Sequence, residues 1–228
     1  MISLPAGIMP QERRRKRGLS ARNIAPRAAP CQAEPDQSGR YNLLFLKRLF
    51  QPQPMRDEGR RLYEALAEHA RQPAFYTDLG VPDSIDGRFE MLCIHAHALF
   101  HRLRSRGAQA DQLGQATYDA MFAGLDAALR EMGVADLGVG RRIKIMTEAL
   151  NGRIQVYDAA LSSADAGALE QAVRRNVYGT VTPPDSQVAA MASYQRALRA
   201  TLARVDDADL LAGQVTLPPP TAGGAYVR

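Results

Sequence analysis

From Asp57 onward, apolar side chains recur at the three- and four-residue spacing of a helix face, and this periodicity limits the possible folds more than any other feature. The clearest stripe lies between residues 83 and 106 and consists of Phe89, Leu92, Cys93, Ala96, Leu99, Phe100 and Leu103. No segment alternates apolar and polar residues over the length of a strand. The sequence therefore predicts an all-α fold, a single bundle of about six to seven helices.

Residues that favour helix ends divide this periodic region into separate helices. Aspartates stand where caps are needed, because a carboxylate accepts hydrogen bonds from the free N–H groups of a first turn. The predicted caps are Asp83, Asp111, Asp136, Asp165 and Asp185. The other predicted turn and helix-end residues are Pro73, which opens a short helix, and Gly80, Pro82 and Gly133. Gly152 falls inside the fifth helix, where it costs about 1 kcal/mol relative to alanine.

The two ends of the chain lack the helical pattern, so we expect one folded domain at residues 41–211. Residues 1–40 hold eight basic and three acidic residues and five prolines, a composition typical of a disordered basic leader. Residues 212–228 are predicted to be a flexible tail. No apolar segment follows the charges of the leader, which excludes a secretory signal and leaves a mitochondrial transit peptide or an upstream start codon. Only three of the 29 basic residues are lysine, which indicates a GC-rich bacterial coding sequence and favours the start codon.

The first apolar segment is Asn-Leu-Leu-Phe-Leu-Lys-Arg-Leu-Phe at residues 42–50. It either lies at a membrane interface, with Lys47 and Arg48 at the headgroups, or folds back onto the bundle as a docking helix. We favour docking, because short apolar segments usually find protein to cover them. No stretch approaches 18 consecutive apolar residues, so no membrane-spanning helix is predicted.

Charge and cysteine usage exclude several classes of protein. The net charge of +5 comes entirely from residues 1–40, because the rest of the chain holds 21 basic and 21 acidic residues. A chain without a basic excess in its folded part is not expected to read nucleic acid. The two cysteines, Cys31 and Cys93, do not make a disulfide framework and indicate a reducing compartment.

The sequence lacks the motifs that nucleophilic catalysis and phosphate binding need. Cys93 lies on the apolar stripe, where a thiolate is disfavoured, and the chain has no Gly-x-Ser-x-Gly motif. Residues 133–140 are rich in glycine, but no strand precedes them and no Gly-Lys-Ser/Thr closes them. A turn between helices is therefore favoured over a phosphate-binding loop. We predict a protein that is not an enzyme and has no catalytic residues.

The histidines supply an alternative function, a metal- or haem-handling helical protein. All four lie in two early helices: His69, His95, His97 and His101. His97 and His101 are four residues apart and could chelate a metal together, with Glu90 near the same face. No Glu-x-x-His or His-Glu-x-x-His motif is present. We therefore interpret Glu90, His97, His101 and Arg104 as a solvated face, and we predict no metal ligands and no cofactor.

Two charged positions are candidates for contacts with a partner. Arg88 lies in the first turn of its predicted helix, where the helix dipole favours anions. Arg88 is therefore expected to pair with a carboxylate of the fold, such as Asp83 or Glu131, or to project to a partner. The adjacent Arg130 and Glu131 form the second position.

Several short segments between Leu62 and Tyr178 together resemble the ubiquinol–cytochrome c chaperone family. They are Arg-Gln-Pro-Ala-Phe-Tyr at 71–76, Leu-Gly-Val-Pro-Asp at 79–83, Asp-Gly-Arg-Phe at 86–89 followed by His95, Arg-Glu-Met-Gly-Val at 130–134, Asp-Leu at 136–137, Val-Gly at 139–140, Gly-Arg at 152–153 with Tyr157, and Arg-Asn-Val-Tyr at 175–178. Each segment is weak alone, but their order and spacing are specific together. Ala135 departs from the family, which usually has glycine there, and a turn should tolerate it.

The resemblance implies an assembly factor that binds newly made cytochrome b and helps it enter the cytochrome bc1 complex, and it supplies no catalytic residues. The implied partners are cytochrome b or bc1 assembly intermediates and, as in mitochondrial relatives, the ribosome and a small partner protein. The implied location is the bacterial cytoplasm, peripheral to the inner membrane, or the mitochondrial matrix and inner membrane in a eukaryote. We expect the client to contact an apolar groove rimmed by Phe75, Tyr76 and Arg88, with Arg130 and Glu131 as further contacts.

Overall fold

The computed structural model describes residues 54–220, which form eight helices and no strand. The helices are α2 (Arg56–Ala70), α3 (Pro73–Thr77), α4 (Ile85–Leu103), α5 (Ala108–Glu131), α6 (Asp136–Ser162), α7 (Ala168–Asn176), α8 (Asp185–Arg204) and α9 (Asp207–Leu211). The all-α prediction is confirmed, and α9 is the helix that the apolar spacing did not predict. The predictions for the leader at residues 1–40 and for residues 42–50 lie outside the described residues.

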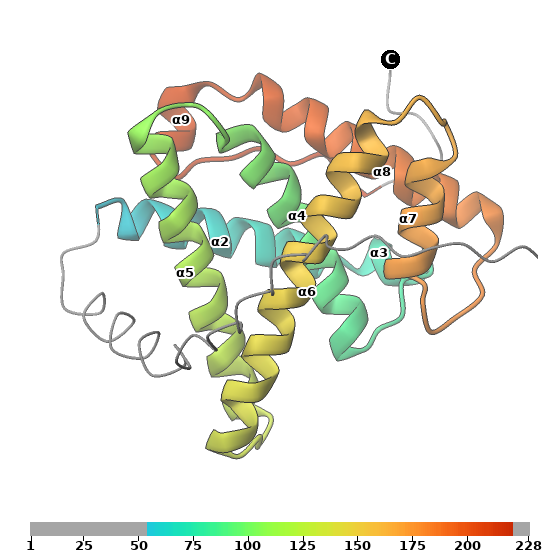
Figure 1. The fold of residues 1–228 in the computed structure, drawn as a ribbon, viewed down its shortest axis with the longest axis horizontal. Coiled ribbons are helices and arrows are strands. Elements are labelled where there is room, and N and C mark those ends of the chain that lie inside the picture. The colour runs from blue at the N-terminus through green and yellow to red at the C-terminus, as the bar shows by residue number, and fades with distance from the viewer. Residues whose placement is uncertain (1–53, 221–228) are drawn as a thin grey trace, which may run out of the picture. The chain divides into compact units, whose positions relative to one another are not determined.

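Helix α4 is enclosed by its neighbours. Fourteen of its nineteen residues are buried, and it packs on α2, α5, α6 and α8. In Figure 1, α4 runs through the middle of the described helices. Because a helix surrounded in this way has no solvent-facing stripe, its polar side chains must find partners inside the fold.

Helices α2 and α5 approach each other closely on one side of α4, and Gly59 makes this approach possible. A methyl group at Gly59 would lie 2.6 Å from the backbone of Ala116 and Thr117, closer than packed atoms can lie. Helices α6, α7 and α8 form the other side, with α7 packed on both of the others. The two groups of helices meet around α4, and the hydrophobic core lies between them.

Helices α5 and α6 form a long hairpin that closes in a tight turn at residues 132–135. Gly133 has a φ of 80°, so it ends α5 in the left-handed conformation. The glycine-rich residues 133–140 therefore form a turn between helices and the start of α6. Figure 1 shows this turn at the lower end of the described helices, beyond the ends of the others. Only Val139 is buried in the first half of α6, because the hairpin projects past the core there.

The aspartates predicted as caps mark the helix starts but do not cap them. Ser84 is the N-cap of α4 instead of Asp83, and its hydroxyl accepts a hydrogen bond from the Gly87 N–H at 3.1 Å. The other four lie near their helix starts without capping them: Asp111, Asp136 and Asp185 in first turns, and Asp165 in the turn before α7. Carboxylates also stabilise a first turn through the helix dipole, so an acidic residue locates a helix start without fixing its cap.

The segment that follows α9 lies against α2. Arg61 donates a hydrogen bond to the Ala212 carbonyl at 3.0 Å, and Gly213 is buried with a φ of 73°. Val215 and Leu217 pack on the hydrophobic core. Residues 212–220, the first part of the predicted tail, are therefore held by contacts with the bundle.

Candidate functional site

Two of the predicted contact residues, Tyr76 and Arg88, lie close together where α3 and α4 meet the surface. Arg88 donates a hydrogen bond from Nε to Asp83 Oδ1 at 2.7 Å, and its guanidinium lies 5.9 Å from the centre of the Tyr76 ring. Ile85, one turn before Arg88 on α4, is 49% exposed. We call Tyr76, Asp83, Ile85 and Arg88 the Tyr76–Arg88 surface. It combines an aromatic ring, an apolar side chain and an exposed ion pair, a mixture common at protein interfaces.

Arg88 pairs with Asp83, a carboxylate of the fold, which is one of the two alternatives expected from the sequence. The hydrogen bond from Arg88 lowers the pKa of Asp83 below its usual value. The Tyr76 hydroxyl donates to the Ala70 carbonyl at 2.8 Å, which fixes one edge of the ring. Arg88 therefore needs no external carboxylate, although its side chain stays more than half exposed and accessible to a partner.

Phe75 is buried, so the expectation that it rims an exposed groove is wrong. Its ring packs edge-on against Tyr194, with ring centres 4.9 Å apart, and also contacts the rings of His69 and His95. Consecutive helical residues point about 100° apart, so Phe75 faces the core while Tyr76 lies half-buried at its edge. A depression of about 570 Å³ does lie on the surface, but Ser163, Asp165 and Arg196 line it, far along the chain from Phe75.

Arg130 and Glu131 lie at the end of α5. Arg130 binds Asp126 through Nε at 2.6 Å and also pairs with Asp136 at the start of α6, which ties the two helices across their turn. Glu131 is exposed. The ion pairs of the described residues join Arg88 to Asp83 and not to Glu131, so the two predicted contact positions are not connected by an ion pair.

Two of the residues interpreted as a solvated face are instead buried, and that interpretation is wrong for them. Glu90 is buried and accepts three hydrogen bonds from Arg153 of α6 at 2.5–3.1 Å. Burial raises the pKa of Glu90 despite this pairing. Burial also raises the pKa of the nearby Cys93 thiol well above its usual value, which disfavours a thiolate.

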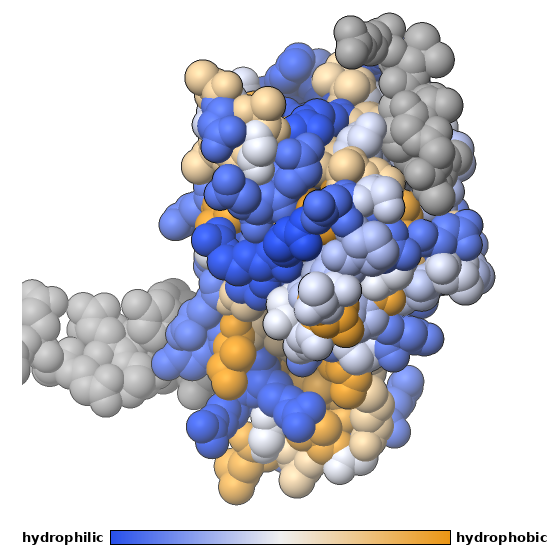
Figure 2. Space-filling view, turned by 90° about the vertical axis from the view of Figure 1, so that its right-hand side faces the viewer, coloured by the Kyte–Doolittle hydropathy of each residue, from blue (hydrophilic) through white to orange (hydrophobic). Residues whose placement is uncertain are grey.

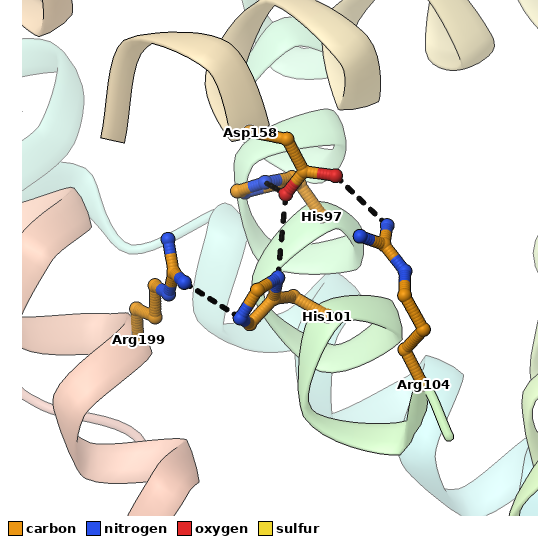
Figure 3. Close-up of polar contacts among 5 residues, drawn as sticks. All are labelled: His97, His101, Arg104, Asp158 and Arg199. Carbon is orange, nitrogen blue, oxygen red and sulfur yellow. Dashed lines mark hydrogen bonds and ion pairs between the residues drawn. The ribbon is translucent and has the colours of Figure 1, made fainter. Parts of the chain in front are cut away.

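The second of them, His97, is only 1% exposed and belongs to a cluster that joins α4, α6 and α8 (Figure 3). Asp158 of α6 accepts hydrogen bonds from His97 Nε2 at 3.0 Å and from His101 Nδ1 at 3.3 Å. Arg104, which is exposed as predicted, reaches the other oxygen of Asp158 at 2.8 Å. Arg199 of α8 donates to His101 Nε2 at 2.7 Å, which requires a neutral His101 with its proton on Nδ1.

The positive charges beside this cluster disfavour a bound cation, because Arg104 and Arg199 both bind its side chains. Burial lowers the pKa of both His97 and His101, and Arg199 lowers that of His101 further. Burial opposes ionisation of Asp158, but hydrogen bonds from His97 and Arg104 outweigh it and lower the pKa. Within residues 54–220, no group of three or more histidine, cysteine or acidic side chains is placed to hold a metal ion. The described residues therefore offer no clustered metal site of the kind that the metal-handling alternative would use.

The partners that complete these clusters were not identified from the sequence. Asp158, Arg153 and Arg199 lie on α6 and α8, about 60 to 100 residues from the α4 side chains that they bind. No local motif marks such pairs, because they form only when the helices pack. Asp158 follows the buried Tyr157 directly, and that neighbour is the one signal that it lies near the core.

No helix within residues 54–220 is both long enough and apolar enough to cross a bilayer.

Comparisons with known proteins place the chain among helical chaperones. The sequence profile of the ubiquinol–cytochrome C chaperone family matches residues 77–217. The fold is similar to the crystal structure of the Cbp3 homolog from Brucella abortus, with a TM-score of 0.64 and 32% sequence identity. This similarity covers 77% of the present chain and 96% of the Brucella chain. A comparison with curated proteins returns no match.

The profile spans more than half of the chain, and the solved structure agrees with it in fold. The chain belongs to the ubiquinol–cytochrome c chaperone family, whose members serve assembly of the cytochrome bc1 complex. The resemblance found in residues 62–178 is thereby confirmed at the level of the family.

Proposed function

We propose that this chain is a non-catalytic assembly factor that binds newly made cytochrome b and promotes its entry into the bc1 complex. The match to the family profile over residues 77–217 carries the proposal, and the similarity to a Cbp3 homolog supports it. Cytochrome b exposes apolar helices until its haems and partner subunits cover them, and exposed surface of that kind aggregates or is degraded. A binder protects such a client by occupancy, so it needs no catalytic residues.

The proposed partners are unassembled cytochrome b and the bc1 assembly intermediates that contain it. The proposed location follows from this client, at the cytoplasmic face of a bacterial inner membrane. The ribosome and a small partner protein would be further partners if the chain acts as its mitochondrial relatives do.

The Tyr76–Arg88 surface is the proposed contact with the client. Its exposed Ile85 and the face of Tyr76 offer apolar area, while Arg88 can hydrogen-bond a loop carbonyl or carboxylate without losing Asp83. Arg130 and Glu131 remain proposed as further contacts, with Glu131 the more accessible because Arg130 already binds two carboxylates.

Deletion of the coding sequence tests the function. A factor dedicated to one client should leave a narrow defect, with low bc1 complex and little assembled cytochrome b while other respiratory complexes stay largely intact. Restoring the protein at graded levels should restore bc1 in proportion, because protection by occupancy depends on the amount of binder. Normal bc1 levels in a clean deletion strain would defeat the proposal.

Copurification of cytochrome b from detergent-solubilised membranes tests the contact surface. Arg88→Ala and Tyr76→Ala should each lower the captured cytochrome b by about fivefold, the effect of losing about 1 kcal/mol of binding energy. Arg60→Ala is the matched control, because Arg60 is equally exposed and also forms one surface ion pair, with Glu64. Equal capture by all three variants would refute the surface and leave the function standing.

A further inference from the structure

The end of the α5–α6 hairpin carries a cluster of exposed apolar side chains. Five large apolar residues are exposed within residues 54–220, and three of them lie here: Met132 at 50%, Leu137 at 95% and Ile145 at 54%. Single exposed apolar side chains are common on protein surfaces, but a group of them at one projecting end indicates a contact site. Figure 2 shows orange patches beside blue ones at the lower end of the molecule, the level at which this turn lies in Figure 1.

Basic side chains accompany these apolar residues. Residues 137–147 contain Arg141, Arg142 and Lys144 and no acidic residue, and all three are exposed. None of the three forms an ion pair with another residue of the described chain. The nearest carboxylate before them, Asp136, is already paired with Arg130. This stretch of α6 therefore presents three uncompensated positive charges.

The apolar and basic side chains share one face of α6. At 100° per residue, Leu137, Arg141, Lys144 and Ile145 lie within about a third of the helix circumference. The buried residues Val139, Leu150 and Tyr157 lie on the opposite face, which packs on the rest of the bundle. The outward face is acidic only at Glu148, one turn nearer the core. The outward face of α6 is therefore both apolar and cationic at its projecting end.

We infer that the end of the α5–α6 hairpin docks on the surface of an anionic membrane. Met132, Leu137 and Ile145 enter the boundary between headgroups and acyl chains, and Arg141 and Lys144 bind lipid phosphates beside them. A bilayer surface supplies phosphate and hydrocarbon side by side, which matches a face where basic and apolar side chains alternate. Because docking is to lipid, this inference does not rest on cytochrome b as the client.

Vesicle flotation of the full chain tests the charged part of this inference. Phosphatidylcholine vesicles are compared with vesicles that also contain phosphatidylglycerol. Arg141→Glu with Lys144→Glu should lower binding to the anionic vesicles by at least about tenfold. Arg175→Glu with Arg204→Glu is the matched control, because it changes the charge equally at exposed positions outside the hairpin and should bind nearly as the wild type does. Equal loss in both double variants would mean that only total charge matters, and would overturn the inference.

A tryptophan placed at Leu137 tests the apolar part. The chain contains no tryptophan, so Leu137→Trp and Val181→Trp each carry a single tryptophan at an exposed position, which can be excited apart from the tyrosines. On anionic vesicles the emission of the Leu137→Trp protein should shift to the blue and be quenched by brominated acyl chains, while that of the Val181→Trp control stays unchanged. Emission that stays unshifted in vesicle-bound Leu137→Trp protein would overturn the inference. A blue shift that follows protein concentration without vesicles would overturn it too, in favour of self-association.

Discussion

His95 is a neutral histidine inside the core, and its hydrogen bonds, which include one between its Nε2 and His69 Nδ1 at 3.0 Å, determine which nitrogen carries the proton. Its Nδ1–H donates to the Met91 carbonyl at 2.7 Å, and its Nε2 accepts from the Tyr194 hydroxyl at 2.7 Å. The ring is fully buried, and burial lowers the pKa of His95 to about 3. The buried rings of His95, Phe75 and Tyr194 thus join α3, α4 and α8 in one aromatic cluster.

We expect acid to destabilise the protein through His95. The unfolded chain takes up a proton there below about pH 6.5, whereas the folded chain does so only near pH 3, so unfolding becomes easier as the pH falls through this range. At pH 4.5 the loss in unfolding free energy from His95 should be about 2.5 kcal/mol relative to pH 7. Urea titrations at the two pH values measure it.

His95→Gln supplies the control for this pH dependence. The variant should be less stable than the wild type at pH 7, because a packed ring is lost, but its stability should fall less on acidification. His97 adds to the acid sensitivity in both proteins, since burial lowers its pKa also. A wild type and variant with the same pH dependence would show that the folded chain protonates His95 as readily as the unfolded chain does.

Pairs that are close in sequence could be predicted, and pairs that are distant could not. Arg88 and Asp83 are five residues apart, and the unfavourable dipole at Arg88 predicted that it would need a carboxylate. The partners of His97 and Glu90 lie on α6, and only the packed structure brings them to α4. Sequence patterns therefore identify charged side chains that need a partner without identifying the distant residue that supplies it.

At the scale of helices, the start of α4 has both an N-cap, Ser84, and an exposed ion pair, Asp83–Arg88. Their contributions to stability can be measured separately. Ser84→Ala should lower the unfolding free energy by about 1 kcal/mol, because it leaves the Gly87 N–H without its acceptor. Asp83→Ala should leave the melting temperature nearly unchanged, because the Asp83–Arg88 pair is exposed to solvent. Thermal unfolding of the two variants measures the difference, and a larger loss for Asp83→Ala would restore Asp83 as the cap.

Two glycines in helices should respond to alanine with opposite signs. A methyl group at Gly152 meets no atom within 4 Å, so Gly152→Ala should raise the unfolding free energy by about 1 kcal/mol through helix propensity alone. Gly59→Ala should lower it by about 1–3 kcal/mol, because the added methyl group collides with the α5 backbone. Chemical denaturation measures both, and destabilisation by Gly152→Ala would reveal a neighbour at that site.

The helices themselves could be predicted because each one has an apolar stripe, but their surroundings could not. The stripe of α4 was identified correctly, and it explains one side of that helix. The opposite side is buried as well, because α6 and α8 cover it. A stripe predicts where a helix meets the core first, and only the packing of later helices decides whether the remaining face stays in water.

At the scale of the whole bundle, Arg102 of α4 binds the C-terminal end of α8. Its guanidinium is buried and donates to the carbonyls of Leu202 and Val205 at 3.0 and 2.7 Å, and to Asp207 of α9 at 2.5 Å. One side chain therefore satisfies carbonyl groups at the C-terminal end of α8 and positions α9. The last carbonyls of a helix lack the N–H groups of a following turn, and here the Leu202 carbonyl accepts from the Val205 N–H at 3.3 Å as well as from Arg102.

Removing this guanidinium should loosen the C-terminal part of the bundle. Arg102→Ala should lower the unfolding free energy by about 3 kcal/mol. Arg102→Lys should recover little of this stability, because the lysine ammonium lacks the planar set of N–H donors of a guanidinium. Arg106→Ala is the control, since Arg106 is exposed and only approaches Asp207 at 4.0 Å. Hydrogen exchange of the α8 and α9 amides should accelerate in Arg102→Ala alone, and unchanged exchange would contradict this role.

The enclosure of α4 has a consequence for the order in which the protein is made. Helix α4 is complete at Leu103, but α8, which covers one of its sides, ends only at Arg204. At a synthesis rate of about 5–20 residues per second, about 5–20 s pass between the completion of α4 and the completion of α8. During this interval the growing chain displays an uncovered apolar helix of its own, the same hazard that membrane-protein subunits present to the cell.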